Sequence, residues 1–109
     1  TALAEQVHSG TNEHAKELLI RALNDDSSEV RAEAATITGK TLEPEEIINE
    51  LCGLLKDKDN QVRINTALAL MKIEEISSIN SLSEAISAEE DGQVKTVLEV
   101  ALNQLIALK

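Results

Sequence analysis

Residues 59–70 read Asp-Asn-Gln-Val-Arg-Ile-Asn-Thr-Ala-Leu-Ala-Leu, and a related stretch lies on each side, at residues 27–37 and 91–102. The three copies are in register, with a valine at the matching position of each: Val30, Val62 and Val94. The valines are therefore 32 residues apart in both intervals. A fixed period of about 20 to 50 residues is typical of repeat proteins, in which each unit packs on the next. The chain is predicted to be a repeat protein.

Hydrophobic residues recur at helical spacing along the chain. In residues 13–24 they stand on one helical face, at i, i+3, i+4, i+7 and i+8: Ala15, Leu18, Leu19, Ala22 and Leu23. Similar patterns predict five further helices, at residues 29–40, 45–56, 60–74, 78–88 and 92–108. An N-cap residue is predicted to open the second helix of each repeat: Ser27, Asp59 and Asp91. Because the chain has no Phe, Trp or Tyr, its core must consist of small aliphatic side chains, which suit close helix packing.

The second helix of each repeat carries a recognisable motif. Residues 30–39 read Val-Arg-Ala-Glu-Ala-Ala-Thr-Ile-Thr-Gly. The second copy keeps five residues of the pattern: Val62, Arg63, Ala67, Ala69 and Leu70. The third copy keeps three residues, Val94, Ala101 and Leu102, and has Lys95 in place of the arginine. The motif resembles the Val-Arg-x-x-Ala-Ala-x-Ala-Leu-Gly helix of HEAT repeats, and among these the short HEAT-like repeats of phycobilisome lyases.

This resemblance implies an all-α fold, a right-handed α-solenoid of antiparallel helix pairs with about three and a half repeats. Residues 1–109 are expected to form a single domain. Its expected parts are a partial repeat or N-terminal helix at 1–10 and full repeats at 11–42, 43–74 and 75–109.

The family also carries an acidic residue in the turn, six positions before the arginine. Three pairs match this spacing here: Asp25/Arg31, Asp57/Arg63 and Glu89/Lys95. Because the pairs recur at the repeat period, we expect a structural ladder, in which each basic side chain reaches a carboxylate of its own or the neighbouring turn. The alternative is a functional row of charges. The lysine rung should be the weakest, since lysine lacks the guanidinium fork.

The formal charge of −10, from 20 acidic and 10 basic side chains, disfavours nucleic acid and anionic lipid as partners. No apolar run approaches the roughly 18 to 20 residues of a membrane span. Residues 1–5 lack the basic segment that opens a secretory signal. The single cysteine, Cys52, fits a reducing compartment. We therefore expect a cytoplasmic protein without nucleic-acid or membrane partners.

No catalytic residue, cofactor or metal site is predicted. His8 and His14 are six residues apart and lack the i, i+4 spacing of a helical ligand pair. Cys52 is expected to be an inert thiol at the edge of the core rather than a nucleophile. The paired carboxylates lie in turns and first helical turns, where solvated caps explain them better than acid–base catalysis.

In this family the second helices line the concave side, so their non-core residues form rows across the repeats. The predicted protein-binding residues are three such rows: Glu33, Asn65 and Val97; Thr36, Leu68 and Val100; Lys40, Lys72 and Gln104. Acidic turns would favour basic partners. The helix at 92–108 is apolar on nearly all sides, which indicates a further interface and allows a homo-oligomer through the terminal helices.

The predicted function is that of a non-catalytic scaffold or adaptor for protein–protein interaction. The resemblance to phycobilisome-lyase repeats implies an enzymatic alternative, a chromophore-lyase-like or lyase-accessory subunit. Such proteins attach bilins to cysteines, but a chain without aromatic side chains offers little to hold a tetrapyrrole. A third reading is a self-assembling structural repeat.

Overall fold

The computed structural model of the chain describes residues 12–41 and 45–109, and these ranges contain helices without any strand. The α-helices are α2 (Asn12–Leu23), α3 (Ser28–Thr41), α4 (Glu45–Gly53), α5 (Asn60–Lys72), α6 (Ile79–Ala88) and α7 (Gly92–Ala107). Two 3-10 helices join them, η1 (Leu54–Lys56) and η2 (Ile76–Ser78). The partial repeat predicted at residues 1–10 lies outside the described residues.

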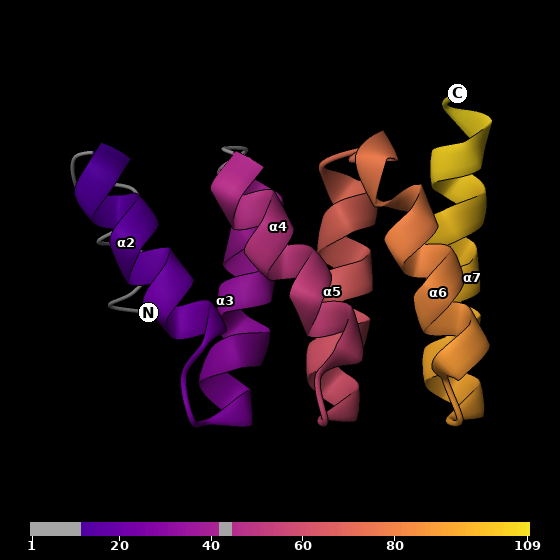
Figure 1. The fold of residues 1–109 in the computed structure, drawn as a ribbon, viewed down its shortest axis with the longest axis horizontal. Helices are drawn as coiled ribbons and strands as arrows, with labels where there is room; N and C mark the ends of the chain where they lie inside the picture. The colour runs from indigo at the N-terminus through magenta and orange to yellow at the C-terminus, as the bar shows by residue number, and fades with distance from the viewer. Residues whose placement is uncertain (1–11, 42–44) are drawn as a thin grey trace.

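The helices succeed one another along the long axis of the molecule, from α2 at one end to α7 at the other (Figure 1). The second helices pack in sequence, α3 against α5 and α5 against α7, while α2 contacts α4 and α6 contacts η1. The chain therefore forms two layers over a body of 37 × 30 × 18 Å. The predicted all-α solenoid is confirmed.

Two helices end at least two residues before the point that the sequence pattern predicted. The helix expected at 45–56 gives way to η1 after Gly53. The helix expected at 60–74 ends at Lys72, because Glu74 adopts a left-handed conformation with φ 57°. The N–H of Glu75 then donates to the carbonyl of Leu70 at 3.1 Å. This reversal satisfies a carbonyl at the end of α5 and turns the chain toward α6.

The core is built from small aliphatic side chains, as the absence of aromatic residues requires. Its largest fully buried hydrophobic members come from both layers: Leu19, Leu23, Ile47, Leu51, Val62, Leu70, Leu82, Val94, Leu98 and Leu105. Small residues let the second helices approach closely. A Cβ added to Gly39 of α3 would lie 3.0 Å from both the Cα and the Cβ of Ala69 in α5.

The predicted N-caps form. Asp59 accepts hydrogen bonds from the backbone N–H groups two and three residues ahead, at 2.9 and 3.1 Å. Asp91 and Ser27 each accept from the third N–H ahead, at 3.0 and 3.4 Å. These bonds satisfy donors that the first helical turn leaves without a partner, so each second helix starts at a fixed residue.

Candidate functional site

An arginine at the start of α3 joins two successive turns. Arg31 donates to both carboxylate oxygens of Asp57, from Nε at 2.8 Å and from Nη2 at 3.1 Å. Its Nη1 donates to the backbone carbonyls of Asp25 at 2.8 Å and Asp26 at 3.0 Å. The carboxylate partner thus belongs to the next turn, while the arginine's own turn contributes only backbone oxygens.

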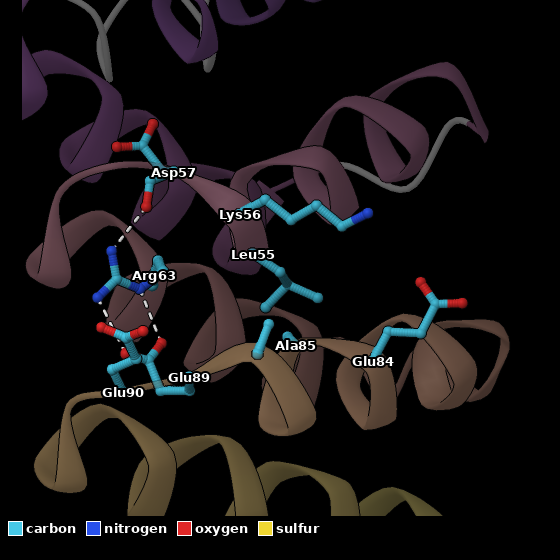
Figure 2. A pocket seen from close by; sticks show the side chains of 9 residues that line it. Leu55, Lys56, Asp57, Arg63, Glu84, Ala85, Glu89 and Glu90 are labelled. Atoms are coloured by element: carbon cyan, nitrogen blue, oxygen red, sulfur yellow. Dashed lines mark hydrogen bonds and ion pairs between the residues drawn. The ribbon is translucent and has the colours of Figure 1, made fainter.

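Arg63 repeats this arrangement one repeat further on. It donates to both carboxylate oxygens of Glu89, at 2.8 and 3.0 Å, and to the backbone carbonyl of Asp57 at 2.7 Å (Figure 2). Its Nη2 also donates to the side chain of Asn60. The pair borders a pocket of about 440 Å³ between η1 and α6. The third predicted rung is different, since Lys95 is exposed and makes no ion pair within residues 12–41 and 45–109.

The two acceptor carboxylates are shielded from water and held in the charged form. Burial raises the pKa of Asp57, but hydrogen bonds from Arg31 and from the N–H of Asp59 outweigh it and hold the pKa below its usual value. Burial likewise raises the pKa of Glu89, but hydrogen bonds from Arg63 and from the N–H of Asp91 outweigh it and hold the pKa below its usual value. Bidentate pairs of this kind fix geometry as well as charge, so they set the spacing of neighbouring repeats.

The predicted binding rows lie on one face, which we call the second-helix face: the outward side of α3, α5 and α7. The first row is half-buried: Glu33, Asn65 and Val97. The other two rows are exposed: Thr36, Leu68, Val100, Lys40, Lys72 and Gln104. Leu68 is 42% exposed and Val100 46% exposed, so the middle row presents two large aliphatic side chains to solvent. That this face binds a protein stays a prediction.

The structure brings five of the nine predicted row residues together around one pocket of about 200 Å³ between α3 and α5, the α3–α5 pocket. Its lining is Thr36, Gly39, Lys40, Asn65, Leu68, Ala69 and Lys72. None of these side chains is acidic. The close contact of Gly39 with Ala69 forms part of its apolar wall.

A second pocket, of about 480 Å³, lies nearer the starts of the same two helices. It is lined by Ser28, Glu29, Ala32, Glu33, Asp59, Gln61 and Asn65. Because Asn65 lines both pockets, they are neighbours on the second-helix face. This face is therefore acidic where α3 and α5 begin and basic where they end.

Two contacts on this face were not foreseen from the sequence. Gly39 was recognised only as a motif residue, although its missing side chain permits the close approach to Ala69. Asn65 was predicted to bind a partner, but its amide donates to the carbonyl of Ala32 at 3.1 Å and so ties α5 to α3. The glycine that ends the motif in the first copy was the available signal for Gly39. No sequence signal indicates the second.

The residues considered for other chemistry lie apart from this face. Cys52 is a half-buried free thiol packed against the core, and burial raises its pKa. His14 is exposed on α2, and His8 lies outside the described residues. In the described part of the chain, no group of three or more His, Cys, Asp or Glu side chains is placed to hold a metal ion. No helix in that part is both long and apolar enough to span a bilayer.

Comparison with known proteins identifies the repeat class. Residues 15–103 match the family model of HEAT repeats. The chain belongs to the HEAT-repeat family, as its motif indicated. It is also similar to a protein of Synechococcus sp. (strain WH8020) named bilin biosynthesis protein MpeU, with 52% identity over 105 residues. The match covers 96% of this chain but only 35% of that relative, so the chain spans about a third of the relative's length.

This similarity overturns one prediction. The chain was expected to have no part in catalysis, whereas a relative that is 52% identical over the 105 aligned residues is named for bilin biosynthesis. The expectation failed because it rested on the absence of a recognisable catalytic motif. A repeat surface can serve an enzyme through ordinary surface residues, which no local motif reveals. The HEAT repeats themselves support the broader prediction of a repeat scaffold.

Proposed function

We propose that this chain is the HEAT-repeat platform of an enzyme of bilin metabolism, of the chromophore-lyase type, and that it works in the cytoplasm. The observation that carries the proposal is the 52% identity with the bilin biosynthesis protein over nearly the whole chain. Identity of that extent, spread over three repeats, supports a similar surface as well as a similar fold.

The reaction class sets what the platform must do. A lyase of this type adds the thiol of an acceptor cysteine across a carbon–carbon double bond of the bilin. The new bond joins sulfur to a bilin carbon, the thiol proton ends on the bilin, and no oxidant or reductant is consumed. The protein must hold the bilin and present it to the acceptor, so a rigid surface with an open pocket suits the task.

The proposal is tested by titrating the purified 109-residue chain with biliverdin, a bilin with free propionates, and recording visible absorption and circular dichroism. We expect a saturable change in absorption and an induced dichroism signal, because a bound bilin takes up one handed conformation. Spectra equal to the sum of the free components at every concentration would contradict the proposal.

A protein-binding role for the same face is favoured by one specific observation, the exposure of Val100 on α7, outside the α3–α5 pocket. We propose that the bilin-acceptor protein docks against it. Val100→Glu should abolish capture of the acceptor while leaving the fold intact. Ile76→Glu should leave capture unchanged, since Ile76 is similarly exposed, at 39%, but belongs to η2. Equal capture by both variants would count against the second-helix face.

A further inference from the structure

The α3–α5 pocket differs in charge from the other two described pockets. The pocket beside Arg63 is lined by four carboxylates, and the pocket at the helix starts by three. The α3–α5 pocket has two lysines, Lys40 and Lys72, and no carboxylate. In a chain with twice as many acidic as basic side chains, this is a local reversal of charge. The pocket is suited to an anion that the rest of the surface repels.

The position of the lysines has a simpler explanation, which accounts for only part of the pattern. Both stand in the last turn of their helices, where a positive charge interacts favourably with the helix dipole. The dipole does not require an exposed leucine between them, nor a glycine at their base. Leu68 is 42% exposed and lines the same pocket as both lysines.

Gly39 and Ala69 make the pocket possible. Since a Cβ on Gly39 would already meet Ala69 at 3.0 Å, the two helices touch backbone to side chain at this point. Packed helices lie about 8–10 Å apart axis to axis, and small contact residues favour the short end of that range. Lys40 and Lys72 hold equivalent positions on the two helices, so their ammonium groups can reach two anionic groups of one ligand.

The next pair of helices lacks the same combination. At the positions that match Gly39 and Ala69, it has Met71 and Ala101. At the position that matches Lys72, one repeat further on, it has Gln104. Methionine is much larger than glycine, and the second positive charge is missing. A periodic structural role would be expected to recur at each pair of neighbouring second helices, whereas this combination occurs in α3 and α5 and not in α5 and α7.

We propose that Lys40 and Lys72 bind the two propionate carboxylates of a bilin, with Leu68 and Ala69 beneath its pyrrole rings. This inference rests on the proposed function and names the part of the surface that holds the substrate. A bilin carries its propionates on neighbouring rings and is otherwise flat and apolar, so its charges and its apolar area match the two kinds of residue in the pocket. The hydroxyl of Thr36 donates to the carbonyl of Ala32 at 3.3 Å and leaves its oxygen free to accept from a pyrrole N–H.

The test compares two ligands and two charge-matched double variants. Biliverdin and its dimethyl ester differ only in their free or masked carboxylates. Lys40→Gln/Lys72→Gln removes the proposed contacts. Lys58→Gln/Lys109→Gln removes the same net charge from exposed lysines that do not line the pocket. Each affinity is measured by visible titration, and far-UV circular dichroism verifies that each variant is folded.

We expect the pocket variant to bind biliverdin about tenfold more weakly than the unsubstituted chain and the control variant to bind within about threefold of it. The dimethyl ester should bind the unsubstituted chain and the pocket variant equally. Equal binding of biliverdin by all three proteins would overturn the inference and leave the proposed function standing. Equal weakening in both variants would also overturn it, because net charge alone would then explain the effect. No bilin binding by any of them would overturn the proposed function itself.

Discussion

Gly39 is the residue at which the packing of α3 on α5 can be tested with a predicted sign. A Cβ at this position would lie 3.0 Å from the Cα and the Cβ of Ala69, whereas carbon atoms in good contact are about 3.5–4.0 Å apart. One of the two contacts is to backbone, which cannot rotate away. Gly39→Ala therefore forces the helices apart by roughly half an ångström at this point.

Two effects of opposite sign decide the result of Gly39→Ala. Overpacking costs about 1–3 kcal/mol, while alanine in a helix interior gains about 1 kcal/mol over glycine. We expect a net loss of about 1 kcal/mol in the free energy of unfolding, measured by urea denaturation with far-UV circular dichroism. For a domain of this size that corresponds to a fall of roughly 4–8 °C in melting temperature.

Gly53 provides the matched control. It has helical backbone angles, φ −59° and ψ −30°, and an added Cβ would meet nothing within 4 Å. Gly53→Ala should therefore stabilise the protein by about 0.5–1 kcal/mol. If Gly39→Ala stabilised it by a similar amount, the two helices would not be in close contact and the account of the α3–α5 pocket would be wrong. Pairing Gly39→Ala with Ala69→Gly should recover part of the loss, because it removes one of the two clashes.

The ladder and the thiol provide three further predictions. Arg63→Gln should lower the free energy of unfolding by about 2–3 kcal/mol, because it leaves the buried carboxylate of Glu89 without its cation. The control Arg21→Gln, at an exposed position, should change the free energy of unfolding by less than about 0.5 kcal/mol. An unchanged melting temperature for Arg63→Gln would refute the structural role of the ion pair. Asp57 and Glu89 have folded-state pKa values below those of the unfolded chain, which are about 4. Their contribution to the free energy of unfolding should therefore be complete above about pH 5 and be lost as pH falls through the folded-state values. Urea titrations at a series of pH values should show that Arg63→Gln loses less stability on acidification than the unsubstituted chain. Because burial raises the pKa of Cys52, iodoacetamide should alkylate this thiol more slowly than free cysteine at neutral pH, as measured by mass spectrometry. An equal rate would show that the thiol is accessible.

The repeat period made most of the fold predictable. A periodic sequence places the same residue type at the same position in each unit, so the helices, the N-caps and the arginine–carboxylate spacing all follow from one alignment. The helix ends were less predictable. Nothing in the apolar pattern distinguishes Glu74, a residue that rarely adopts positive φ, as the point at which α5 reverses.

The partner of each arginine shows where sequence reasoning stops. The spacing left two carboxylates open to Arg31, one in its own turn and one in the neighbouring turn, and in the structure its partner is Asp57 of the next turn. Both options fit the same period, and only the stacking of the repeats selects between them. The α3–α5 pocket was hidden for a similar reason, since it depends on how closely Gly39 approaches Ala69 across 30 residues of chain.

The ladder and the α3–α5 pocket occupy opposite ends of the same two helices. Arg31 and Arg63 lie in the first turns of α3 and α5, and Lys40 and Lys72 in the last. Nine residues separate each arginine from its lysine, or about 13 Å at 1.5 Å per residue, which exceeds the range of a direct contact. The ion pairs therefore fix the register of neighbouring repeats at one edge, and the α3–α5 pocket lies at the other edge with no carboxylate in its lining. Substitutions at the two edges should then act independently, the arginines on stability and the lysines on bilin affinity, and a double variant should show the sum of both effects.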